Sequence, residues 1–137
     1  MEEVFGGVIS SYSRAQAIED GVLVDVTEMA RKAGIVYPVA LTSAVYQGCV
    51  QVPKGLEHLQ DEPGRLHDVL WMYRWAVKVG IIRGDHGLFE VSFLMWEGKN
   101  VLDARLGDLN RKVTLKAVCG PGDDPSPCIT IMLPDED

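Results

Sequence analysis

Residues 64–95 read GRLHDVLWMYRWAVKVGIIRGDHGLFEVSFLM, and the spacing of apolar residues changes within them from a helical to a strand pattern. In the first half of this stretch, apolar residues recur every three or four positions, as on a helix with one buried face. Gly80 is a natural stop for such a helix. In the last seven residues, apolar residues occupy every second position, which is typical of a strand. We therefore expect a helix over residues 64–79 and a strand over residues 89–95.

The segments on either side of this stretch divide into helices before it and strands after it. Upstream, capping residues and glycine stops predict short helices at residues 14–19 and 28–33 and from residue 38 to about 47 or 49, with one short strand at residues 22–26. Downstream, alternation predicts strands at residues 113–119 and 129–133, a weaker strand at 101–106 and an acidic loop at 120–127. Long loop signals occupy residues 51–63.

This segregation predicts an α+β fold. We expect an antiparallel sheet of three to five strands, mostly C-terminal, with about four helices from the N-terminal half packed on one face. No linker or repeat interrupts the chain, and its length is close to the commonest domain size, so we expect one domain over residues 1–137.

The composition is that of a globular protein with an excess of acids. Hydrophobic residues make up 47% of the chain, and the formal net charge is −7. Phosphate backbones repel a negative protein, so we expect no direct nucleic-acid binding. No apolar run approaches the roughly 18 residues that span a bilayer, and the first residues, MEE, lack the basic start of a signal peptide. We therefore expect a cytoplasmic protein without membrane association.

The sequence shows no motif for nucleophilic, metal or phosphate chemistry. It lacks a Gly-x-Ser-x-Gly elbow. Its three cysteines, Cys49, Cys119 and Cys128, lack zinc-site spacing and are expected to be reduced thiols. The glycine-rich segment near the C-terminus carries Asp123 and Asp124, which would repel phosphate; they could hold calcium or magnesium, but we favour a solvated loop. We expect no cofactor and no metal, and we favour a protein without catalytic activity.

The densest polar cluster lies at the start of the main helix. Its candidate binding residues are Asp61, Glu62, Arg65, Asp68, Trp71 and Trp75. Asp61 and Glu62 are placed to cap the helix and to offset its dipole. Trp71 and Trp75 fall on the side away from the apolar stripe, beside basic residues. They form either a binding patch, because Trp and Arg are favoured interface anchors, or core residues if the sheet covers this side too.

A second polar set lies near the N-terminus and contains Tyr12, Arg14 and Asp25. Asp25 interrupts an otherwise apolar strand. A buried carboxylate needs a partner, so we expect a salt bridge to Arg14. Together with Asp68, this set could instead line a pocket.

Three stretches carry a resemblance to a known family. They are residues 9–26 (ISSYSRAQAIEDGVLVDV), residues 60–72 (QDEPGRL followed by DVLWM), and residues 120–134 (GPGD followed by ITIMLP). In these stretches the chain resembles an uncharacterised bacterial family whose members occur in chromosomes, plasmids and phages. The resemblance covers nearly the whole chain but implies no activity, ligand or catalytic residue. The association with mobile elements implies an accessory role, such as interference with a host defence system.

Three functions fit these observations. The first is a small acidic protein-binding module whose partner is a host protein or protein complex, for example a mobile-element inhibitor of a host defence (anti-CRISPR-like) complex. The second is a small enzyme or small-molecule binder with a polar cleft lined by Arg14, Asp25, Arg65 and Asp68. The third is an oligomerisation domain, such as a homodimer formed through the two tryptophans.

Overall fold

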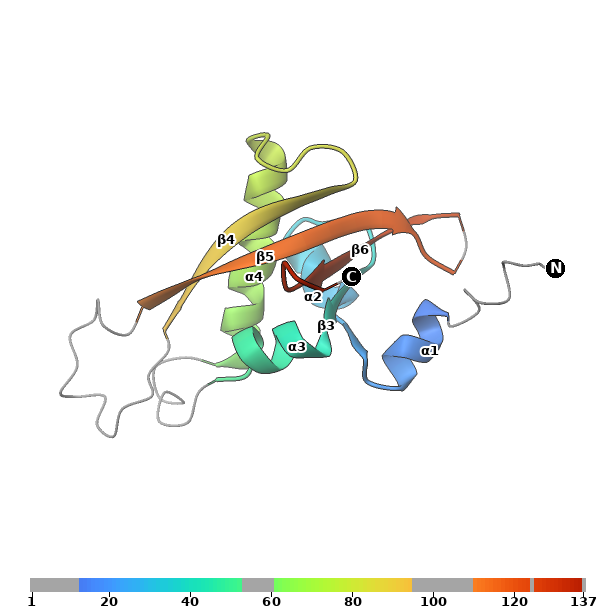
Figure 1. Cartoon of the computed structure of the whole chain (residues 1–137), viewed down its shortest axis with the longest axis horizontal. Coiled ribbons are helices and arrows are strands. Elements are labelled where there is room, and N and C mark those ends of the chain that lie inside the picture. The colour runs from blue at the N-terminus through green and yellow to red at the C-terminus, as the bar shows by residue number, and fades with distance from the viewer. Residues whose placement is uncertain (1–12, 53–60, 95–109, 124, 137) are drawn as a thin grey trace.

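A five-stranded sheet forms the centre of the part of the chain that the computed structural model describes, residues 13–52, 61–94, 110–123 and 125–136 (Figure 1). The strands are β2 (Leu23–Asp25), β3 (Val39–Thr42), β4 (His86–Leu94), β5 (Asn110–Pro121) and β6 (Pro127–Met132). Their order in the sheet is β2-β3-β6-β5-β4. All neighbours are antiparallel except β3 and β6, which run parallel. The predicted α+β class is confirmed, and the sheet is mixed but mostly antiparallel.

The helices all precede β4 in sequence. They are α1 (Arg14–Glu19), α2 (Thr27–Lys32), α3 (Ser43–Val45), the π-helical turn η2 (Tyr46–Val50) and α4 (Glu62–Lys78). The first begins as predicted, because Ser13 Oγ accepts a hydrogen bond from the Gln16 amide at 2.9 Å. The main helix α4 begins with Asp61, whose Oδ1 accepts from the Gly64 amide at 2.8 Å, and it ends two residues before Gly80. Both predictions are confirmed.

The predicted third helix is wrong in its first part. Residues 39–42 form β3, which lies between β2 and β6, and helix starts only at Ser43. Val39, Ala40 and Leu41 are all fully buried, so this central strand is covered on both faces. Such a strand is apolar throughout and shows no alternation, which removes the signal that separates a strand from a buried helix.

The start of the second helix also differs from the prediction, in which the Thr27 side chain caps a helix over residues 28–33. Thr27 is the first helical residue of α2 and does not cap it. The carboxylate of Asp25 accepts hydrogen bonds from the Thr27 amide at 3.1 Å and from the Thr27 hydroxyl. Asp25 therefore performs the local role that the sequence assigned to Thr27, because a short acidic side chain can bond a backbone amide two residues ahead.

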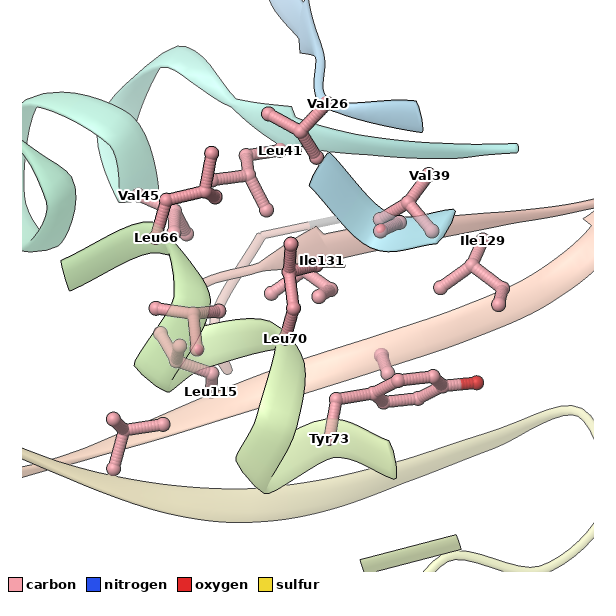
Figure 2. Close-up of a cluster of buried hydrophobic side chains, with 14 of the residues drawn as sticks. Val26, Val39, Leu41, Val45, Leu66, Leu70, Tyr73, Leu115, Ile129 and Ile131 are labelled. Carbon is pink, nitrogen blue, oxygen red and sulfur yellow. The ribbon is translucent and has the colours of Figure 1, made fainter. Parts of the chain in front are cut away.

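The main core lies between α4 and one face of the sheet. Leu66, Leu70 and Tyr73 of α4 meet apolar side chains of the central strands (Figure 2). The predicted buried stripe of α4 is confirmed at these positions, but Val77, which the same periodicity includes, is 45% exposed. The weaker strand predicted at residues 101–106 and most of the loop predicted at 51–63 lie outside the described residues.

The other face of the sheet has a smaller covering that involves α1, which stands apart from the other helices in Figure 1. Ile129 and Ile131 of β6 belong to the main core, so the alternate residues point to the opposite side. There, Arg14 of α1 reaches Thr130. The sheet register pairs Cys119 with Ile129 and Cys128 with Gly120, which places the two thiols on opposite faces, and all three cysteines are free.

Candidate protein-binding surface

The outer side of α4 carries two partly exposed tryptophans. Trp71 is 46% exposed and Trp75 is 44% exposed, so the sheet does not cover them. They are four residues apart and lie side by side, one helical turn from each other. The buried stripe anchors the helix, which fixes the backbone positions from which the two indoles project.

Trp71 is also held by its neighbours on the same helix. The His67 ring stacks beside the indole, with ring centroids 6.4 Å apart and an angle of 10° between the planes. The guanidinium carbon of Arg74 lies 5.7 Å from the centre of the Trp71 ring, within range of a cation–π interaction. A side chain that is already ordered loses less entropy on binding, so Trp71 is suited to anchor a partner.

A groove of about 820 Å³ runs between α4 and β4. We call it the α4–β4 groove. Its apolar lining includes Trp71, Trp75, Ile81 and Leu88, and the last two are about half exposed. The groove is therefore an open hydrophobic trough that contains both tryptophans.

Exposed apolar side chains concentrate around this helix. Nine large hydrophobic side chains are exposed among the described residues, and eight of them lie on α4 or in the segments beside it: Val36, Tyr37, Trp71, Trp75, Val77, Val79, Ile81 and Leu88. Val36, Tyr37 and Val77 line a second, smaller hollow of about 270 Å³ on the other flank of α4. Three of these side chains, Trp71, Trp75 and Val77, lie on α4 itself, and the other five lie in neighbouring segments. Scattered surface hydrophobics need no explanation, whereas a cluster of them is typical of interaction surfaces.

The predicted polar cluster at the start of α4 is mostly structural. Asp61 caps the helix. Glu62 accepts a hydrogen bond from the Tyr46 hydroxyl at 2.8 Å, and this bond is the main reason that the pKa of Tyr46 is raised. Arg65 is 1% exposed and donates from Nε to the carbonyl oxygen of Cys49 at 2.7 Å, at the end of η2. Asp68 lines the α4–β4 groove, where partial burial raises the pKa of its carboxyl.

One of the comparisons with known proteins identifies a family, and none of them supplies an activity. The model of DUF6573, a family of unknown function, matches residues 1–137. The chain belongs to this family. No curated protein and no solved structure matched the chain. DUF6573 membership thus supplies no function.

The N-terminal polar set of this DUF6573 protein is arranged differently from the prediction. The predicted Arg14–Asp25 salt bridge is wrong. Asp25 is exposed and is satisfied by Thr27, so it needs no buried cation. The Arg14 guanidinium donates instead to Thr130 Oγ1 at 2.6 Å and to the Ile129 carbonyl at 2.8 Å. Both are contacts between parts of the chain that lie more than a hundred residues apart, which no local pattern predicts.

Asp123 also has a structural role. Its two carboxylate oxygens accept from the backbone amides of Arg14 at 2.6 Å and Ala15 at 3.0 Å, at the start of α1. An acid at the positive end of a helix dipole stabilises that end. The sequence did not connect Asp123 to this helix. Tyr12 and Asp124, the remaining predicted site residues, lie outside the described residues.

The four residues of the predicted polar cleft do not converge. Arg14 lines a hollow of about 860 Å³ beside α1, Asp25 lines another of about 590 Å³ beside α2, Asp68 lines the α4–β4 groove, and Arg65 is buried. In the hollow beside Arg14, the polar groups bind one another. Glu136, for example, accepts from the Thr42 hydroxyl and from the Leu133 amide, both at 2.8 Å.

Among the described residues, no three His, Cys, Asp or Glu side chains lie together in a way that could hold a metal ion. None of the described helices combines the length and the apolar character needed to cross a lipid bilayer.

Proposed function

We propose that this protein is a non-catalytic binding module that holds a partner protein in the α4–β4 groove. One observation carries the proposal: two half-exposed tryptophans, one of them fixed by His67 and Arg74, line a groove of about 820 Å³. Trp is among the residues most enriched at the energetic centre of protein interfaces. Each indole leaves nearly half of its surface exposed in this groove, and clustered exposed apolar surface is typical of interaction sites.

Charge supports a basic partner. The chain carries a formal net charge of −7. The charged groups that line the groove are Asp68, Glu90 and Lys112, so acids outnumber bases there as well. Complementary charge steers association and selects partners, so the proposed partner presents apolar side chains flanked by Lys or Arg.

A finer version of the proposal names the kind of partner. A host complex that handles nucleic acid has basic channels, and an acidic protein can occupy them. The chain would then act as a mobile-element inhibitor of a host defence complex, in the manner of an anti-CRISPR protein. This version is supported by net charge and by the resemblance to a family found in plasmids and phages, so it is the first partner class to test.

The test compares the wild-type protein with Trp71→Ala/Trp75→Ala and with a matched control, Val22→Ala. Val22 is 50% exposed but belongs to the segment between α1 and β2, away from the groove. A partner captured from host lysate by wild type is purified, and its affinity for each variant is measured by calorimetry. Loss of two anchor indoles should weaken binding at least about 30-fold, since a hot-spot residue contributes about 2 kcal/mol or more.

The control variant should bind within about twofold of wild type, since a truncated surface side chain outside an interface changes little. A second groove variant, Leu88→Lys, tests the opposite wall and covers the case in which the double variant does not fold. Equal affinity of wild type, the double variant and Leu88→Lys would overturn the proposal.

A further inference from the structure

The α4–β4 groove lies along an edge of the sheet that is free of any further described strand. The strand order places β4 at one edge and β2 at the other. Strand β2 has three residues, whereas β4 has nine and pairs with β5 in continuous register over all of them. Among the described strands, β5 is the only neighbour of β4. This edge is therefore the long one that the described sheet offers to another strand.

The hydrogen-bond pattern shows which residues of β4 face outward. The Cys119 amide donates to the Asp85 carbonyl at 2.7 Å, one step before the β4–β5 register begins with His86 opposite Val118. Antiparallel pairs alternate between bonded and non-bonded residues, so the odd-numbered residues of β4 bond to β5. The hairpin between β5 and β6 agrees with this assignment. The amide of Gly122, just after β5, donates to the carbonyl of Ser126, just before β6. Even-numbered residues of β5 therefore bond to β6, and odd-numbered residues bond to β4.

It follows that Leu88, Glu90 and Ser92 direct their backbone N–H and C=O groups toward the free edge. All three are exposed, and all three line the α4–β4 groove. Natural edge strands are usually protected by Pro, by Lys or by a bulge. Strand β4 has no Pro, Lys or Arg, its pairing with β5 contains no bulge, and its one acidic residue is Glu90.

We propose that the groove receives an extended segment of a basic partner protein, which pairs with β4 as an additional strand. This inference rests on the proposed function and specifies its binding mode. Backbone hydrogen bonds to Leu88, Glu90 and Ser92 supply affinity, as in other cases of strand addition. Apolar side chains of the segment contact the tryptophans, and a Lys or Arg lies opposite Glu90, because opposite charges across a strand pair are favourable.

A second copy of the chain fits this edge less well than a basic partner does. Glu90 is the central residue of β4, so two copies paired in full antiparallel register would place Glu90 opposite Glu90. Like charges directly opposite each other destabilise a strand pair. Each copy also carries a formal charge of −7. Sedimentation of the free protein should therefore show a monomer, and a dimer that dissociates in Ser92→Pro would overturn the choice of partner.

The probe is a nine-residue peptide selected on wild-type protein from a random displayed library. The selected sequences should alternate apolar residues with Lys or Arg. Two chemical forms of one such peptide are compared: the parent, and a form with N-methyl groups on the alternate amides that face β4. The two have the same side chains, but methylation removes the backbone donors. Losing one interfacial hydrogen bond should weaken binding about tenfold, and losing several should weaken it more.

The protein side of the test uses Ser92→Pro and its matched control Ser92→Ala. Proline removes an N–H that faces the free edge and leaves the β4–β5 hydrogen bonds in place, a position that edge strands tolerate. We expect about tenfold weaker peptide binding for Ser92→Pro and binding within about twofold for Ser92→Ala. Hydrogen exchange on wild type provides a direct readout: the peptide should slow exchange at Leu88, Glu90 and Ser92, whereas Phe89 and Val91 are already protected by β5.

The outcomes separate the binding mode from the proposed function. If peptide binding requires Trp71 and Trp75 but ignores both N-methylation and Ser92→Pro, and exchange at the three edge amides is unchanged, strand addition is wrong and the groove remains a binding surface. If no selected peptide distinguishes wild type from Trp71→Ala/Trp75→Ala, the proposed function fails with it. If Ser92→Pro does not fold, the methylated peptides and the exchange measurement on wild type decide.

Discussion

Replacing Gly34 with alanine should loosen the residue that holds Trp71 in place. Gly34 follows α2 with φ of +90°, and a Cβ atom there would lie 2.8 Å from Arg74 Nε and 3.3 Å from its guanidinium carbon. Gly21 follows α1 with φ of +79°, and a Cβ there would meet nothing within 4 Å. Both glycines end a helix with the same two backbone hydrogen bonds. After α2, the amides of Ile35 and Gly34 donate to the carbonyls of Ala30 and Arg31, and after α1, the amides of Val22 and Gly21 donate to the carbonyls of Ala17 and Ile18.

The matched geometry lets the two substitutions be compared directly. A left-handed conformation costs an alanine about 1–2 kcal/mol, so Gly21→Ala should lose about that much stability. Gly34→Ala should lose the same amount and also the contact of Arg74 with Trp71, which contributes about 0.5–1 kcal/mol at an exposed site. The excess corresponds to about 2–4 °C in melting temperature for a chain of this size.

Urea unfolding of the two variants, with unchanged m values, measures this excess. The same pair is then made in an Arg74→Ala background, where the excess should disappear because no guanidinium remains to be displaced. Tryptophan fluorescence should change in Gly34→Ala and not in Gly21→Ala. If the two variants lose equal stability, or if the excess persists without Arg74, the account of Trp71 as a residue held by Arg74 is refuted.

Four further predictions concern the fold and its titrating groups. Asp61→Ala should lower the free energy of unfolding by about 1 kcal/mol by removing the cap of α4, while Asp61→Asn should stay near wild type; urea unfolding measures both. Leu70→Ala should lose about 3–5 kcal/mol in the same assay, because this fully buried side chain leaves a cavity. Burial raises the pKa of the Asp68 carboxyl in the folded state. The contribution of this group to folding stability is therefore fully present below its ordinary pKa and is lost as the pH rises through the raised value. Asp68→Asn should be more stable than wild type at pH 7, and this difference should vanish in acid. Cys119 is half-buried and should be alkylated before Cys49, whose burial raises the thiol pKa; mass spectrometry of labelled peptides gives the order.

The elements that could be predicted from the sequence are those with long, one-sided burial and local end signals. Helix α4 buries one face over 17 residues and carries its cap at Asp61, so period and boundary agree. Strand β4 lies at the edge of the sheet and β5 is its neighbour. Along both strands, covered residues alternate with more exposed ones. Their alternation is visible without a structure because only one face is buried.

The central strand could not be predicted for the opposite reason. Strand β3 has neighbours on both sides and is covered on both faces, so its sequence carries no period. Pro38 just before it matched the start of a helix. Whether such a segment is strand or helix is decided by partners in β2 and β6, and the latter lies about ninety residues away along the chain.

The candidate surface was partly visible in the sequence. The helical spacing placed Trp71 and Trp75 on the side away from the buried stripe, but it left open whether the sheet covers them. Whether the sheet covers the two indoles depends on the position of β4, the strand at that edge of the described sheet. The outward direction of the Leu88, Glu90 and Ser92 backbone depends on the parity of the β4–β5 hydrogen bonds, and one residue of register shift would exchange the bonded and free sets.

The arrangement of the acids explains why an apolar surface is the stronger functional candidate. Asp61 caps α4, Asp25 bonds Thr27, Asp123 binds the first amides of α1, and Glu136 joins Thr42 to Leu133. A carboxylate that accepts such bonds is held in place by the fold and has a structural role there. The indoles of Trp71 and Trp75 differ in this respect, because each leaves nearly half of its surface exposed to water. Covering that surface would gain hydrophobic free energy without breaking any of the bonds that hold the fold, and this supports the proposed binding module over the alternative of a polar catalytic cleft.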